Sequence, residues 1–185
     1  MQSALNFPSL RPSGSGMDSN FNVVIAYEDF ETGKHAKRTY DFLVEHLGEE
    51  CQFNNQMWKF DVLAVPRLRE MAAKDAAQAD IIIVAAHGGN ELPVEVHSWI
   101  ESWLMEQTRA IALVGLFDPN EVRENPAGRY LAQVARRAGM EYFGQPGLWP
   151  EGGPALGSEI NERTFSALTG MVQLDRDISH WGINE

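Results

Sequence analysis

The sequence predicts an α/β fold in which five parallel strands form one doubly wound sheet, in the order 2-1-3-4-5, with helices on both faces. Apolar runs alternate with helical patterns five times from residue 21 onward. Continuous apolar runs are typical of strands covered on both faces, and strands that alternate with helices pair in parallel through right-handed crossovers. The chain has 185 residues, of which 44% are hydrophobic, and can bury one full core. We therefore expect a single α/β domain.

The first two units of this pattern place a strand at residues 23–26 and a more polar strand at 51–58. An acidic turn and an amphipathic helix that ends near Gly48 separate them. The polar make-up of the second strand favours the edge of the sheet. Pro66 then opens a helix, because proline is tolerated in a first helical turn. The residues that we expect this helix to turn inward are Leu68, Met71, Ala72 and Ala76.

The central strand is expected within the wholly apolar run 81–86, and two further strands are expected at 109–117 and 140–143. The helix after the central strand carries a buried stripe of Val96, Trp99, Ile100, Trp103 and Leu104. The helix after the fourth strand turns inward Leu131, Val134, Ala135 and Ala138. A Gly/Pro-rich connection at 144–157 leads to a last amphipathic helix, whose apolar side is formed by Ile160, Thr164, Ala167, Leu168 and Met171.

The expected organisation is a flexible leader at 1–20, one domain at 21–174 and a tail at 175–185. The leader has neither a cationic start nor a continuous apolar run, so we expect no signal peptide and no membrane anchor. No apolar stretch is long enough to span a bilayer, and a cytoplasmic protein is therefore expected.

The charge and the cysteine content exclude several classes of function. A formal net charge of -11, from 15 Lys and Arg against 26 Asp and Glu, opposes binding to nucleic acid, whose phosphates need many basic contacts. We therefore expect a protein partner or a small ligand, or a homodimer, and neither nucleic acid nor a membrane. Cys51 is the single cysteine, which excludes an intrachain disulfide. It is expected to be a small buried residue, and a catalytic thiol is the alternative.

The strand order predicts one crevice at the carboxyl edge of the sheet. Between the first and third strands the sheet reverses its direction of growth, so the loops after these two strands face each other. The candidate pocket residues from these loops and from the ends of the fourth and fifth strands are Tyr27, Thr32, Gly33, Lys34, His87, Gly88, Gly89, Asn90, Asp118 and Gln145.

Several of these residues have more than one interpretation. Glu28 and Asp29 could bind magnesium weakly, since a third carboxylate is missing, or they could form a solvated turn or an N-cap for the first helix. His87 could cap the next helix, bond a neighbouring carbonyl or act in catalysis. Gly88 and Gly89 could supply only the positive φ of a tight turn.

Three short segments at strand ends share a pattern with a known family. Residues 24–29, Val-Ile-Ala-Tyr-Glu-Asp, place an acidic pair after the first strand, and residues 138–146 end in Gln145-Pro146. Together with 80–85, they resemble the receiver domains of response regulators, in which the acidic pair holds magnesium. In that family an aspartate stands at the position of Ala85, a hydroxyl near Gly115 and a lysine before the proline. The resemblance implies a receiver-like fold that has lost its phosphoacceptor.

Two loops share a pattern with a second family. Residues 86–93, Ala-His-Gly-Gly-Asn-Glu-Leu-Pro, are similar to a flavin-contacting loop of flavodoxins, except that Asn90 replaces the second glycine. Residues 31–35, Glu-Thr-Gly-Lys-His, look like the flavodoxin phosphate loop, although acidic residues surround it. This resemblance implies a flavin mononucleotide (FMN) cofactor.

These patterns together predict a non-catalytic receiver-like or flavodoxin-like module, with a role in signalling, that acts through a protein or ligand surface and carries no cofactor. An FMN-binding redox protein is the alternative, and an enzyme that uses His87 with the acidic loop is a third hypothesis. No nucleophile elbow, zinc-protease motif or P-loop occurs in the sequence.

We predict that acetyl phosphate or a beryllofluoride mimic forms no stable adduct with the protein, because Ala85 has no carboxylate to accept a phosphoryl group. Intact-mass measurement checks this, and a gain of one phosphoryl group would contradict it.

A second prediction concerns the C-terminal tail. Large apolar groups such as Trp149, Ile178 and Trp181 lie in stretches too short to form their own core, and each contributes about 1.5–3 kcal/mol when it is buried. Deletion of residues 179–185 should therefore lower the melting temperature by several degrees or dissociate an oligomer. If the shortened protein melts and elutes like the full chain, the tail is free to dock on a partner.

Overall fold

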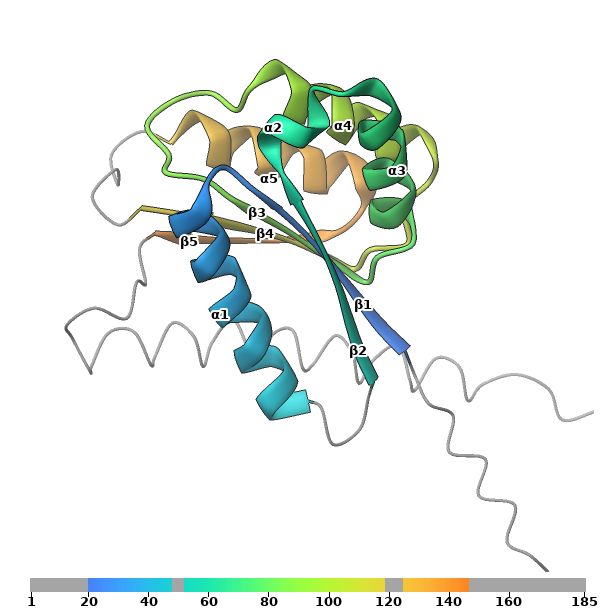
Figure 1. Ribbon diagram of the computed structural model, residues 1–185, viewed down its shortest axis with the longest axis vertical. Coiled ribbons are helices and arrows are strands. Elements are labelled where there is room, and N and C mark those ends of the chain that lie inside the picture. Colours follow the sequence, from blue (N-terminus) through green and yellow to red (C-terminus); the bar gives the residue numbers. More distant parts are fainter. Residues whose placement is uncertain (1–19, 48–51, 119–124, 147–185) are drawn as a thin grey trace, which may run out of the picture.

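The computed structural model describes residues 20–47, 52–118 and 125–146, and these residues form a five-stranded parallel sheet with helices on both faces (Figure 1). The strand order is β2-β1-β3-β4-β5, as the sequence predicts. The strands are β1 (Asn20–Tyr27), β2 (Gln52–Lys59), β3 (Ile81–Ala85), β4 (Ala112–Phe117) and β5 (Glu141–Pro146). The helices are α1 (Phe30–Leu47), α2 (Phe60–Leu63), α3 (Pro66–Ala77), α4 (Val94–Met105) and α5 (Pro126–Ala138).

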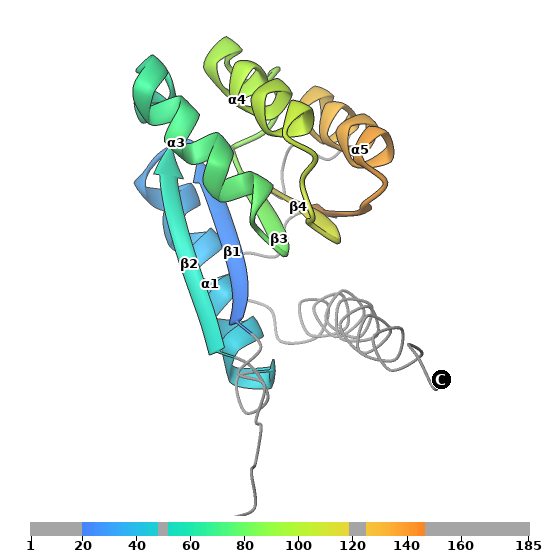
Figure 2. The same ribbon diagram turned by 90° about the vertical axis from the view of Figure 1, so that its right-hand side faces the viewer.

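The three central strands, β1, β3 and β4, are covered on both faces, and the core therefore has two layers. Helix α1 lies on one face, and α2 to α5 lie on the other (Figures 1 and 2). In β3, Ile82 and Val84 pack toward α2–α5, whereas Ile81 and Ile83 pack toward α1. All five residues of β3 are buried, which explains its continuous apolar sequence.

Local signals in the sequence account for the helix ends. In α5, Pro126 occupies the first turn, and the Asn125 side chain accepts a hydrogen bond from the Gly128 N–H at 2.9 Å. The helix ends at Gly139, whose φ of 71° lies in the left-handed region that glycine adopts without strain. Pro66 likewise occupies the first turn of α3.

The structure corrects several details of the sequence prediction. The short helix α2 was not expected, and it follows β2 without an intervening loop. Residues 144–146 belong to β5, not to the connection that follows it, because each pairs with a residue of β4. Met71 is 49% exposed and does not point inward. Asn20, assigned to the leader, begins β1. Cys51, residues 1–19 of the leader, the expected helix around 160–171 and the tail lie outside the described residues.

The tryptophans of α4 are core residues, as predicted. Trp99 and Trp103 are fully buried, and their rings meet edge to face with centroids 6.1 Å apart. Neither indole N–H has a hydrogen-bond partner among the described residues.

Packing explains the glycine at position 115, where the receiver resemblance expects a hydroxyl. A Cβ atom added to Gly115 would lie 2.7 Å from Cε2 of Phe117 and 2.7 Å from the hydroxyl oxygen of Tyr142. Two aromatic rings therefore fill the space that a side chain would need. Burial of Tyr142 raises the pKa of its hydroxyl to about 12, so the group stays neutral in this packing.

We predict that Gly115→Ser lowers the melting temperature by several degrees, since overpacking a filled core costs about 1–3 kcal/mol. Thermal unfolding measures the change. The double variant Gly115→Ser, Tyr142→Phe should recover part of the loss, because it removes one of the two clashing atoms. A single variant that melts like the wild type would contradict this account of the packing.

Candidate functional site

Helix α1 begins just after β1 with a reciprocal cap between Asp29 and Thr32. The Thr32 N–H donates to Oδ1 of Asp29 at 3.0 Å, and the Asp29 N–H donates to Oγ1 of Thr32 at 2.9 Å. This is the capping-box arrangement, with threonine in the third helical position. Thr32 is fully buried, and the Gly33 N–H donates to the Asp29 carbonyl at 2.9 Å. The first turn of α1 therefore has its amide groups at 32 and 33 satisfied within the chain.

Gly33 is explained by the ring of Tyr27, the last residue of β1. A Cβ at position 33 would lie 2.8 Å from Cδ2 of Tyr27. The glycine in this motif thus allows a tyrosine ring to lie against the first turn of α1. A glycine needed for this contact gives no evidence for a phosphate loop.

His87 stands two residues beyond the end of β3, and its backbone is hydrogen-bonded to both neighbouring segments. Its N–H donates to Oε2 of Glu28 at 2.8 Å, and its carbonyl accepts a hydrogen bond from the Asp118 N–H at 3.1 Å. Gly88 and Gly89 come next, with φ values of 86° and 76° that suit glycine. The chain therefore turns sharply away from His87 before it reaches α4.

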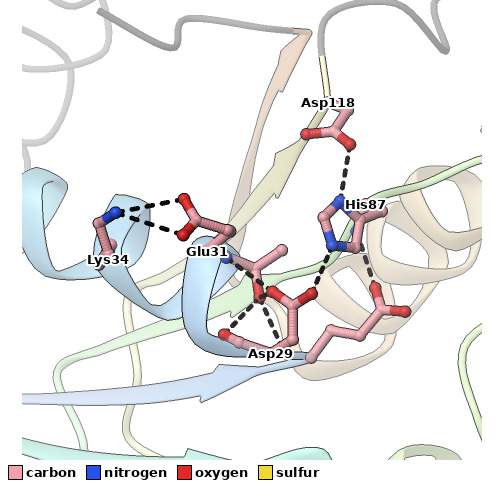
Figure 3. Close-up of polar contacts among 7 residues, drawn as sticks. Asp29, Glu31, Lys34, His87 and Asp118 are labelled. Carbon is pink, nitrogen blue, oxygen red and sulfur yellow. Dashed lines mark hydrogen bonds and ion pairs between the residues drawn. The ribbon is translucent and has the colours of Figure 1, made fainter.

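The His87 ring lies between two carboxylates that come from different strand ends (Figure 3). Nε2 is 2.7 Å from Oδ2 of Asp29, and Nδ1 is 2.7 Å from Oδ2 of Asp118. Ionised carboxylates only accept hydrogen bonds, and neutral imidazole has a single N–H. Both contacts therefore form together when His87 is an imidazolium that donates one hydrogen bond to each aspartate.

The pKa values agree with this charge state. The hydrogen bonds to Asp29 and then to Asp118 raise the pKa of His87 to about 9. The Thr32 backbone N–H, with a further contribution from His87, lowers the pKa of Asp29 to about 2. On α1, burial lowers the pKa of His35 to about 4, with Arg38 adding to the effect.

Lys34 lies apart from this cluster, on the exposed side of α1. Its Nζ is 3.3 Å from Glu31, and it lies 5.2 Å from the centroid of the Phe30 ring. Figure 3 shows the Glu31–Lys34 pair separated from His87. Phe30, the first residue of α1, is 73% exposed, and no sequence pattern pointed to it.

The structure thus brings together some of the predicted pocket residues and separates others. Asp29, His87 and Asp118 form one hydrogen-bonded group, which Thr32 supports. Gly89 and Asn90 are exposed on the loop. The register places Gln145 of β5 beside Leu116 of β4. The Gln145 side chain lies outside the described part of the structure. Within the described residues, the His87 ring neither caps α4 nor bonds a carbonyl, because its two nitrogens face the carboxylates of Asp29 and Asp118. The Asp-x-x-Thr spacing is the signal that identifies Asp29 as a cap.

The two carboxylates predicted to bind magnesium are already engaged within the chain. Oε2 of Glu28 accepts from the His87 N–H, and both oxygens of Asp29 accept hydrogen bonds. Within the described ranges, no group of three or more His, Cys, Asp and Glu side chains is placed to hold a metal ion. Likewise, the described helices include none that is long and apolar enough to cross a membrane.

Comparisons with known proteins relate the fold to that of flavodoxins. No protein-family model and no curated protein matches the chain. The Streptococcus pneumoniae TIGR4 flavodoxin superposes with a TM-score of 0.54 at 18% identity, over 82% of this chain and 99% of that one. A short-chain flavodoxin associated with a bacterial microcompartment gives 0.51 at 16% identity, over 84% and 98%. Rubredoxin:oxygen oxidoreductase from Desulfovibrio gigas gives 0.52 at 14% identity, over 82% of this chain and 38% of that one.

At these identities the comparisons show the fold alone. The chain therefore has a flavodoxin-like α/β fold, with a five-stranded parallel sheet in the order 2-1-3-4-5.

We predict that the free energy of unfolding decreases between about pH 6.5 and 9 because of His87. Its folded pKa of about 9 lies above the ordinary histidine value of 6.5, so its contribution is complete below pH 6.5 and is lost as the pH rises through 9. The pKa of His35 is shifted in the opposite direction, so its contribution is present above pH 6.5 and is lost as the pH falls through about 4. Urea unfolding across this range should show an alkaline decrease that is smaller in His87→Gln. The control His97→Gln should keep the decrease, and an equal decrease in all three proteins would contradict the assignment to His87.

Proposed function

We propose that the protein is a non-catalytic binding module of flavodoxin-like fold, which holds a protein partner or a small ligand at the carboxyl edge of its sheet. The observation that carries the proposal is the Asp29–His87–Asp118 group. Its side chains, which lie where ligands bind in open α/β sheets, are bonded to one another.

The acidic group argues against a phosphate at the start of α1. The Asp29 carboxylate already accepts the Thr32 N–H, where a ligand's phosphate would need a free donor. Two unit charges of the same sign 4 Å apart repel by about 4 kcal/mol at an effective dielectric of 20, whereas a helix N-terminus contributes roughly 0.3–1 kcal/mol. The repulsion outweighs the attraction. A ligand at this edge is therefore expected to carry no phosphate at the start of α1.

The same group argues against general-base and phosphoryl-transfer chemistry. With a pKa of about 9 and a carboxylate at each ring nitrogen, His87 is protonated at neutral pH and cannot accept a proton. At the end of β3, Ala85 is fully buried and offers no carboxylate. These features favour binding over catalysis at this edge.

An FMN-binding redox protein is a second candidate, and specific observations favour it. Two of the three solved structures reported above are flavodoxins, and residues 86–93 are similar to a flavin-contacting loop of that family. FMN could occupy this edge only if its phosphate displaced the Asp29 carboxylate from α1 or bound elsewhere.

Flavin binding distinguishes the two candidates. We predict that freshly purified full-length protein has no flavin absorbance at about 450 nm and does not quench the fluorescence of added FMN. Riboflavin, which has no phosphate, serves as a parallel titrant, and Asp29→Asn as a variant that keeps the cap but removes the charge. Stoichiometric FMN in the wild type would reject the binding-module proposal and support the redox candidate. Quenching by FMN in Asp29→Asn alone would show that the carboxylate excludes the phosphate.

A further inference from the structure

His87 uses all four of its hydrogen-bonding groups to join three separate segments. Its N–H and its Nε2 bond the β1–α1 turn through Glu28 and Asp29, and its carbonyl and its Nδ1 bond Asp118 at the end of β4. Along the sequence, His87 is 59 residues from Glu28, 58 from Asp29 and 31 from Asp118. Within the described residues, the following positions Gly89, Asn90 and Glu91 are exposed.

The opposite end of this loop is fixed independently. Leu92 is buried in the core shared with α4, and Pro93 precedes the first turn of that helix. Between the two fixed ends lies the segment 88–91. It begins at Gly88 and Gly89, which have positive φ values and no side chain to restrict a change of backbone angle. The loop therefore has two anchors and a pair of glycines at the His87 end.

We propose that His87 is a clasp that, as an imidazolium, holds the loop 88–91 against the β1–α1 turn and β4, and that this loop opens at the carboxyl edge of the sheet when the ring leaves the two carboxylates. The clasp depends on charge as well as shape. A neutral ring would direct one lone pair at a carboxylate oxygen 2.7 Å away, so one of the two contacts would break. The inference does not depend on which ligand the crevice binds.

The charged groups around the ring are consistent with a closed clasp. Glu28 and Asp29 face His87 from the β1–α1 turn, and Asp118 faces it from β4. Lys59, at the end of β2, and His35, on α1, interact electrostatically with Asp29 and Asp118 respectively. The three carboxylates outweigh the single positive charge of the ring, which favours keeping the imidazolium in place.

The charge state can be observed directly in the wild-type protein. Nitrogen-15 NMR of full-length protein labelled at histidine, at about pH 7, should show both ring nitrogens of His87 carrying a proton. His87→Ala assigns the signals by their loss. A single protonated nitrogen on His87 would overturn the proposal.

Opening of the loop is measured at constant pH by hydrogen exchange of the backbone amides at positions 87 and 118, which donate to Oε2 of Glu28 and to the carbonyl of residue 87. We expect exchange to rise about tenfold in His87→Ala and in Asp118→Asn, the factor that corresponds to the loss of ~1.4 kcal/mol from a charge-assisted hydrogen bond. His97→Ala is the matched control, because His97 contacts the Tyr130 ring at a centroid distance of 4.2 Å on the α4–α5 side, and it should leave the loop unchanged.

A double variant separates a clasp from a general loss of stability. If Asp118 acts on the loop through the His87 ring, adding Asp118→Asn to His87→Ala should increase exchange no further. Independent, additive effects of the two substitutions would overturn the proposal, as would unchanged exchange in either single variant.

Discussion

The burial of β3 on both faces is the constraint on which the rest of the structure depends. All five of its residues are buried, so the strand has no exposed face on which a polar side chain could lie. Polar groups can begin only where the strand ends, and His87 stands two residues beyond Ala85. Because β1 and β4 flank β3 in parallel, their ends reach the same edge and bring Asp29 and Asp118 to either side of the ring. The geometry of the site is thus a consequence of the strand order.

The residues of the site satisfy one another's hydrogen bonds. Asp29 caps α1 with one oxygen and binds His87 with the other, and His87 binds a second carboxylate through its remaining nitrogen. Each contact is partly exposed, with 43% of the His87 side chain accessible, so solvent weakens every interaction taken singly. The contacts matter together, because through them His87 fixes the relative positions of three segments that are distant in sequence. Any ligand at this edge must either fit around that arrangement or replace part of it.

Three glycines show how a packing requirement can imitate a functional motif. Gly33 accommodates the Tyr27 ring, and Gly115 and Gly144 accommodate the rings of Phe117 and Tyr142. In the sequence, Gly33 lies in a stretch that looks like a phosphate loop, and Gly115 stands where a receiver domain has a hydroxyl. Nearby aromatic side chains explain both positions. The number of residues between each glycine and its aromatic neighbour differs from case to case, so such contacts cannot be recognised without coordinates.

The sequence by itself determined the fold class, the strand order and the edge of the sheet at which the polar loops meet, because hydrophobic periodicity and helix-end signals are local properties of the chain. It also predicted that His87, Asp29 and Asp118 lie at the same edge of the sheet. It did not predict α2, the exposure of Met71 or the length of β5, since these depend on which surfaces happen to be covered by other elements. Only the tertiary structure decided that Asp29 and Asp118 lie on opposite sides of one imidazole ring. Hydrogen-bond partners separated by tens of residues are set by packing to within an ångström, and no pattern along the chain records that distance.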